Sequence, residues 1–168
     1  MFNFRSSRFI AFFICHELIV IAYYFQFVDH LEPCPLCIFQ RLVFFVMGLM
    51  FLMAAIHNPS NKGKLYYNSI TLVVSIVGIF ISGRHVWLQH LPKDQVPTCG
   101  PGLNYLLDNF PLSDALNQIL RGSGECADVS WTLFGFSMPE LTLMLFITFA
   151  AWLTLALWNK ELPKNLKI

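Results

Sequence analysis

Four long apolar stretches stand out in the pattern of hydrophobic and polar positions along the chain. They cover residues 9–28, 37–56, 66–82 and 141–158. A helix needs about 20 mostly apolar residues to cross roughly 30 Å of hydrocarbon, and all four stretches come close to that length. The pattern therefore predicts an all-α membrane protein whose fold is a bundle of four transmembrane helices.

The segments between these stretches differ in length. Residues 57–65 form a short polar turn, whereas residues 29–36 and 83–139 form two loops on the opposite side of the membrane. In the longer loop, apolar residues recur at helical spacing, namely Leu112, Leu116, Ile119 and Leu120. This spacing predicts a short amphipathic helix that lies on the membrane surface. Ser137, followed three residues later by Glu140, has the pattern of a capping box and predicts the start of the fourth helix.

The distribution of positive charge predicts the orientation of the bundle. With four spans, both termini and the polar turn share one side, which carries seven basic residues: Arg5, Arg8, Lys62, Lys64, Lys160, Lys164 and Lys167. The other side carries four: Arg41, Arg84, Lys93 and Arg121. Cytoplasmic segments of membrane proteins are enriched in Lys and Arg. We therefore expect cytoplasmic termini and two loops that face the outside of the membrane.

Composition narrows the class of protein further. The chain has 168 residues, of which 56% are hydrophobic and 12% are charged, and its mean hydropathy is +0.58. An ordinary soluble domain has about 25% charged residues, so a soluble globule and a disordered chain are both excluded. The formal net charge of +1 argues against a nucleic-acid partner. The length fits one integral membrane domain, residues 1–168.

Four of the five cysteines fall on the predicted outer side. Cys34 and Cys37 form a C-x-x-C pair at the start of the second stretch, and Cys99 and Cys126 lie in the long loop. Disulfides form and persist outside the cytoplasm, so the positions of the cysteines agree with the orientation that the charges predict. Cys15 lies within the first stretch, where we expect a small buried side chain.

The C-x-x-C pair has the features of a reactive dithiol. It precedes a predicted helix, whose unpaired N–H groups and positive dipole end favour a thiolate. Arg41 follows Cys37 by four residues and so lies about one turn below it on the same face. An arginine near the edge of the hydrocarbon is costly and usually functional. It is placed to stabilise a thiolate or to bind a polar ligand.

Other interpretations of these residues stay open at this point. In one interpretation, Cys34 and Cys37 form a static disulfide, and the Arg41 side chain extends to the membrane–water interface. In another, the two cysteines bind zinc together with His30, His85 or His90, although these histidines lack regular ligand spacing. His16 and Glu17 are adjacent in the first stretch, and we interpret them as a structural polar pair near the interior of the bundle.

Four segments together resemble one known family. They are Glu32–Arg41, which reads E-P-C-P-L-C-I-F-Q-R, then His85–Gln89, Pro97–Cys99 and Gly124–Ala127. With the four spans in this order, the chain is similar to the disulfide bond formation protein B (DsbB) family over nearly its whole length. The resemblance implies a quinone-linked protein thiol-disulfide oxidoreductase in the bacterial inner membrane, with its cysteine loops in the periplasm.

The resemblance also implies a partner and roles for the cysteines. The partner is DsbA, a periplasmic thiol oxidase with a thioredoxin fold, and the electrons pass to the membrane quinone pool. By position, Cys99 resembles the cysteine that DsbA attacks. Cys126 resembles its redox partner, which can also pair with Cys34 in an intermediate between the two loops.

The remaining implied roles concern the quinone, which is ubiquinone or menaquinone. Cys37 resembles the thiolate that meets the quinone ring, Arg41 the arginine that contacts it, and His85 a histidine near it. A vitamin K epoxide reductase-like protein also combines four helices, a C-x-x-C pair and a quinone, but its motif lies toward the end of the bundle. A membrane protein without enzymatic activity, stapled by disulfides or binding a metal, is the alternative outside the enzymes.

Overall fold

Four long helices form the body of the protein. The computed structural model describes all residues except 1–2, 93, 98–104, 106–107, 130 and 162–168. Its long helices are α1 (Phe4–Phe27), α2 (Pro35–His57), α3 (Asn61–Gln89) and α7 (Met138–Glu161). Each contains a stretch that is long and apolar enough to cross a membrane. The predicted four-helix membrane fold is confirmed.

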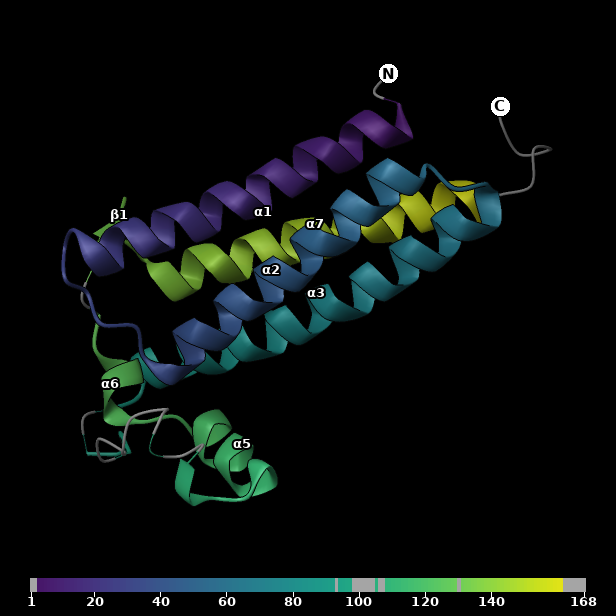
Figure 1. Cartoon of the computed structure of the whole chain (residues 1–168). Helices are drawn as coiled ribbons and strands as arrows, with labels where there is room; N and C mark the ends of the chain where they lie inside the picture. The colour runs from purple at the N-terminus through teal and green to yellow at the C-terminus, as the bar shows by residue number, and fades with distance from the viewer. Residues whose placement is uncertain (1–2, 93, 98–104, 106–107, 130, 162–168) are drawn as a thin grey trace.

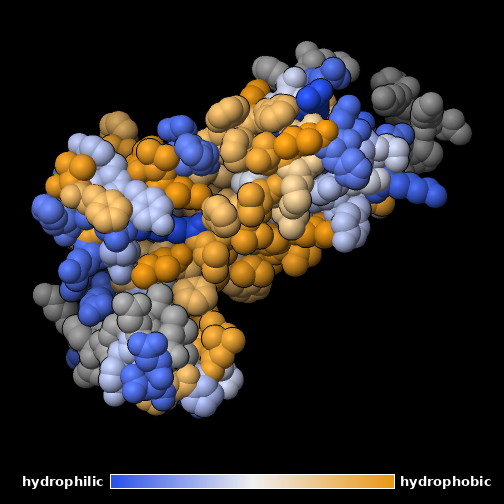
Figure 2. All heavy atoms as spheres, in the orientation of Figure 1, coloured by the Kyte–Doolittle hydropathy of each residue, from blue (hydrophilic) through white to orange (hydrophobic). Residues whose placement is uncertain are grey.

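The helices lie side by side in one bundle (Figure 1). α1 packs along α2, α2 along α3, and α3 along α7, whereas α1 and α7 make few close approaches to each other. α1 begins and α7 ends at the same end of the bundle, and the short elements of the long loop gather at the opposite end (Figure 1). Apolar residues form a broad band between two more polar ends (Figure 2). The bundle thus has the surface expected of a membrane-embedded protein.

The core is tightest where α2, α3 and α7 meet. The ring of Phe44 stacks on that of Phe146, with 4.2 Å between the centroids. A Cβ atom at Gly78 would come within 2.6 Å of the Phe146 ring, so a glycine is needed at this crossing. The hydroxyl of Ser75 donates a hydrogen bond to the carbonyl of Phe146 at 2.9 Å. Small and polar residues of α3 therefore bring α7 close, as is typical of helix packing in membranes.

The third helix is longer than the apolar stretch 66–82 predicts. It runs from Asn61 to Gln89, so the outer loop begins seven residues later than expected, after residue 89 instead of residue 82. The apolar stretch ends at Ser82 because Gly83, Arg84 and His85 follow it. The helix continues past this point, and Arg84 in its extension donates hydrogen bonds to the carbonyls of Leu120 and Arg121, at 3.1 and 2.8 Å. α2 and α7 extend one to three residues beyond their predicted spans at each end. α1 begins five residues before its predicted span and ends one residue short of it, at Phe27.

The long loop carries short elements that lead back to the bundle. The predicted amphipathic helix is present as α5 (Leu112–Arg121), of which Ile119 is buried and Leu112 is exposed. Next come α6 (Gly124–Ala127) and a hairpin of β1 (Thr132–Leu133) and β2 (Phe136–Ser137). The predicted cap of α7 is confirmed, because the Ser137 backbone N–H donates to the Glu140 carboxylate at 2.7 Å.

The polar pair in α1 does not face the interior of the bundle. The side chains of His16 and Glu17 are 55% and 65% exposed, with 3.5 Å between the imidazole nitrogen and the carboxylate. The expectation of an interior pair is therefore wrong. Ala11 and Cys15 define the buried face of α1, and each further residue turns by about 100° around the helix. Residues 16 and 17 thus point away from that face. The expected burial of Cys15 is confirmed.

Candidate active site

The C-x-x-C pair forms the first turn of α2. Cys34 is the N-cap, Pro35 is the first helical residue, and the Cys37 N–H donates a hydrogen bond to the Cys34 sulfur at 3.4 Å. Proline suits this position because the fixed φ angle matches a helix and the missing N–H has no partner there anyway. The two sulfur atoms and a ring nitrogen of His85 all lie within 4.8 Å of one another. The local sequence therefore brings two thiols together at the end of a helix.

A third thiol reaches this pair from the long loop. Cys126, in α6, is fully buried and forms a hydrogen bond with Cys34. The hydroxyl of Ser123 lies 3.8 Å from the Cys126 sulfur. α6 packs against α3, which holds it beside the start of α2. The loop thus places Cys126 where a disulfide exchange with Cys34 needs little movement.

The environment of Cys34 and Cys126 keeps both thiols protonated. The hydrogen bond from Cys126 lowers the pKa of the Cys34 thiol, but a hydrogen bond to Cys37 and burial outweigh it and raise that pKa to about 12. The hydrogen bond to Cys34 and burial both raise the pKa of the Cys126 thiol. The three sulfur atoms form a chain in which Cys126 donates to Cys34 and Cys34 donates to Cys37.

His85 connects the dithiol to a buried polar network. Its Nε2 lies 3.6 Å from the Cys34 sulfur, and its Nδ1 lies 3.3 Å from the side-chain nitrogen of Gln40. The side-chain oxygen of Gln40 accepts a hydrogen bond from the Thr142 hydroxyl at 3.3 Å. Residues of α2, α3 and α7 thus form one hydrogen-bonded network beside Cys34.

Arg41 is held by α1. Its guanidinium donates hydrogen bonds to the Gln26 side chain and, at 3.1 Å, to the backbone carbonyl of Ala22. It also lies over the Tyr23 ring, 5.3 Å from the centroid. A guanidinium held between two helices is a fixed positive charge. This arrangement differs from an Arg41 side chain that reaches freely into the interface.

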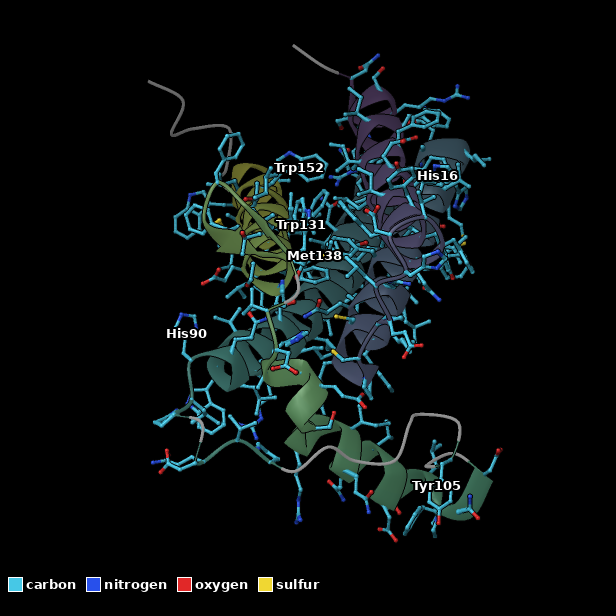
Figure 3. All side chains as sticks on the ribbon, turned by 90° about the vertical axis from the view of Figure 1, so that its left-hand side faces the viewer. His16, His90, Tyr105, Trp131, Met138 and Trp152 are labelled. Atoms are coloured by element: carbon cyan, nitrogen blue, oxygen red, sulfur yellow. The ribbon has the colours of Figure 1, made fainter. Side chains whose placement is uncertain are left out.

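A cavity of about 250 Å³ opens between α1, α2 and α7 beside Cys37. Most of its wall is apolar and includes Leu18, Phe44 and Leu141, while its polar lining comes from Cys37, Gln40, Arg41 and Thr142. Trp131 and Met138 also line it, and Figure 3, which looks along the bundle, shows both labels between α1 and α7. The Trp131 ring contacts that of Phe25, with 4.8 Å between the centroids. A reactive sulfur and a cation therefore border an apolar space within the membrane.

The structure brings together most of the residues that the sequence singles out. Cys34, Cys37 and Cys126 adjoin one another, and Arg41 lines the cavity. Cys99 lies outside the described residues. His85 lies beside Cys34 and is not among the residues that line this cavity. A contact between His85 and a quinone therefore stays a prediction.

Several residues of the site were missed from the sequence. Gln40, Thr142 and Gln26 form its polar network, and Trp131 covers the cavity. The one available signal was the polar pair Gln40 and Arg41 within an otherwise apolar stretch. Polar side chains within a membrane span usually have a function. This argument points to Gln40 as well as to Arg41.

The fold and the site define a class of protein. A dithiol at one end of a membrane bundle, in contact with a loop thiol and open to an apolar cavity, has the parts of a membrane thiol-disulfide oxidoreductase. Comparison with known proteins gives the family. A family model described as "Disulfide bond formation protein DsbB" matches residues 4–156. The chain belongs to this family, as the resemblance in the sequence predicted.

Similar proteins carry the same name. The chain is 53% identical to "Disulfide bond formation protein B" of Nitrosococcus oceani over 143 residues, which are 85% of each chain. It is 48% identical to the protein of that name from Methylococcus capsulatus over 157 residues, 94% of this chain and 96% of the other. The protein is therefore a multi-pass membrane oxidoreductase of disulfide bond formation. The vitamin K epoxide reductase-like alternative loses its support.

Proposed function

We propose that this protein reoxidises a periplasmic DsbA-type thiol oxidase and passes the electrons, through two cysteine pairs, to ubiquinone or menaquinone in the inner membrane. The observation that carries the proposal is the apolar cavity that adjoins both Cys37 and Arg41. A dithiol that exchanged electrons only with soluble proteins would need no such opening. The loop end of the bundle faces the periplasm in this proposal, and both termini lie in the cytoplasm.

The residues of the cavity fit a quinone head group. A quinone is a flat, mostly apolar ring with carbonyl oxygens that accept hydrogen bonds, and the cavity joins apolar walls to the donors of Arg41 and Gln40. A guanidinium has five N–H donors, so Arg41 can hold α1 and still donate to a ligand. A quinone held here would supply an acceptor for two electrons and two protons. Arg41 would stabilise negative charge on the Cys37 sulfur and on the ligand oxygen.

The cysteines carry the electrons in a sequence of disulfide exchanges. A thiolate of the partner attacks Cys99 of a Cys99–Cys126 disulfide, and Cys126 leaves with the electron pair of the broken bond. The second thiol of the partner then attacks the mixed disulfide, which releases the partner in its oxidised form. The reduced pair Cys99 and Cys126 passes its two electrons to the Cys34–Cys37 disulfide by further exchange. The contact of Cys126 with Cys34 supports this transfer.

Steady-state turnover of single-cysteine variants tests the proposal. The purified chain is mixed with a reduced DsbA-type protein and a soluble quinone, and quinone absorbance and partner thiols are followed together. We expect Cys37→Ser to lose at least about a hundredfold in rate, because the last exchange has no sulfur to carry it. Cys15→Ser is the matched control, since Cys15 is buried in α1 away from this site, and it should retain the parent rate. Full activity of Cys37→Ser would contradict the proposal.

Zinc binding is a second candidate function, favoured by one observation. Cys34, Cys37 and His85 offer three ligand atoms within 4.8 Å of one another. Structural zinc sites use four protein ligands, and the described residues supply three in this group. Metal analysis of the purified chain, before and after oxidation by a quinone, separates the two functions. One zinc per chain that survives oxidation would favour the metal site, because a disulfide cannot supply two thiolate ligands.

A further inference from the structure

We propose that Gln40 is a positioning residue that holds His85 in the tautomer whose Nε2–H points at the Cys34 sulfur. The sequence patterns place neither residue in this role. The proposal assigns to Gln40 an effect on disulfide exchange although its side-chain hydrogen bonds, among the described residues, go to His85 and Thr142.

The orientation of the Gln40 amide decides which nitrogen of His85 is protonated. Gln40 is 4% exposed, so its amide has to find partners within the protein. Its oxygen lies 3.3 Å from the Thr142 hydroxyl, which also lies 2.9 Å from the Pro139 carbonyl, and in this orientation its nitrogen lies 3.3 Å from His85 Nδ1. An amide nitrogen can only donate. His85 Nδ1 must therefore accept, and the neutral ring carries its single proton on Nε2.

The surroundings of Nε2 suit that proton. Nε2 lies 3.6 Å from the Cys34 sulfur. The Cys34 thiol donates its own proton to Cys37, so its sulfur can accept from a donor at Nε2. His85 is 2% exposed.

The consequence for exchange rests on the proposed function. A thiolate that attacks Cys126 in a Cys34–Cys126 disulfide displaces Cys34, which leaves with the electron pair of the broken S–S bond. The Cys34 sulfur then receives two N–H donors, the Cys37 backbone at 3.4 Å and His85 Nε2 at 3.6 Å. Hydrogen bonds to a charged group are the stronger ones. Gln40 therefore lowers the energy of the Cys34 anion by fixing the donor that faces it.

Nitrogen NMR of the parent chain tests the tautomer directly. The reduced full-length chain is labelled with ¹⁵N-histidine in detergent micelles, and the signals of His85 are assigned from their loss in His85→Asn. We expect an unprotonated Nδ1 and a protonated Nε2. A protonated Nδ1 would overturn the proposal. In that case the Gln40 amide is rotated by 180° and its nitrogen donates to the Thr142 hydroxyl. That hydroxyl then donates to the Pro139 carbonyl at 2.9 Å.

Variants test the effect on Cys34. Gln40→Met keeps the volume of the side chain and removes its hydrogen bonds. We expect iodoacetamide to alkylate Cys34 roughly tenfold more slowly in this variant, because the Cys34 thiolate, which is a charged group, loses one hydrogen bond. Thr142→Val frees the amide to rotate and should give a smaller decrease. The matched control is Thr148→Val in the same helix, whose hydroxyl bonds only to the Met144 carbonyl among the described residues. It should leave the rate unchanged.

The outcomes separate this proposal from the proposed function. Neither the NMR spectrum nor the alkylation rate requires a partner protein or a quinone. An unchanged alkylation rate in Gln40→Met would overturn the role of Gln40, whatever the turnover of the enzyme. Loss of turnover in the parent chain, with the expected tautomer present, would instead overturn the proposed function alone. The spectrum of the parent chain decides the tautomer even if Gln40→Met does not fold.

Discussion

At the scale of single residues, Cys34 and Cys126 differ from ordinary thiols because both are buried and hydrogen-bonded. The pKa of Cys34 is raised from 9.0 to about 12. A raised pKa keeps the proton on the sulfur, so the reactive thiolate is scarcer at every pH below that value. We expect the alkylation rate of reduced Cys34 to rise about tenfold per pH unit between pH 8 and 10. Mass spectrometry of iodoacetamide-treated chain measures it.

The control for this pH dependence is an exposed thiol in the same chain. Ser113 is exposed in α5, and a cysteine introduced by Ser113→Cys should approach a constant rate above pH 9. Cys126 should behave like Cys34, since its hydrogen bond to Cys34 and its burial raise the pKa of the Cys126 thiol. If the Cys34 rate levelled off near pH 9, the protonated chain of thiols described above would be wrong.

The sequence allowed a prediction of which residues react, but not of how they are held. Cysteines and an arginine at the ends of apolar stretches are conspicuous, so Cys34, Cys37 and Arg41 could be named. The partners of Gln40 could not, because His85 is 45 positions away along the chain and Thr142 is 102. A glutamine near the end of a span has no local pattern that indicates such partners.

At the scale of elements, one glycine sets the position of α6. Gly122 joins α5 to α6 with a φ of +82°, and a Cβ atom there would come within 2.2 Å of the Leu88 side chain. Leu88 is fully buried in α3 and cannot easily move aside. We expect Gly122→Ala to displace α6, and with it Cys126, from Cys34. Faster alkylation of Cys126, by at least about fivefold, is the measurable sign, because a displaced thiol is more exposed.

The hairpin before α7 provides the matched control for Gly122. Gly135 has a similar φ of +86°, but a Cβ atom there meets nothing within 4 Å. Gly135→Ala therefore carries the backbone strain of about 1 kcal/mol without the clash. Equal alkylation of Cys126 in the two variants would show that the contact with Leu88 does not position α6.

The ends of the helices were the least predictable part of the elements. Hydropathy identified all four spans, because the bilayer demands length and apolar composition. It ended the third span at residue 82, seven residues before the helix ends at Gln89. Within that extension, Arg84 donates hydrogen bonds to carbonyls of α5. Hydropathy measures only the solvent that a residue prefers, and it carries no information on a partner from another element.

At the scale of the whole molecule, the site lies at one end of the bundle and most of the predicted cytoplasmic charge at the other. α5, α6 and the hairpin lie together at the loop end, away from the start of α1 and the end of α7 (Figure 1). An electron donor in the periplasm and an acceptor in the membrane can meet only at the outer edge of the bilayer. The proposed function therefore requires that the loop end faces outward.

Labelling of intact cells tests this orientation. Ser113 in α5 and Ser60 at the turn between α2 and α3 are both exposed, at opposite ends of the bundle. We expect a membrane-impermeant maleimide to label the Ser113→Cys variant in intact cells above the background of the parent chain. The Ser60→Cys variant should be labelled only after the inner membrane is permeabilised, because the basic residues around that turn hold it in the cytoplasm. The reverse pattern would place the dithiol in the reducing cytosol, where a thiol oxidase has no disulfides to supply.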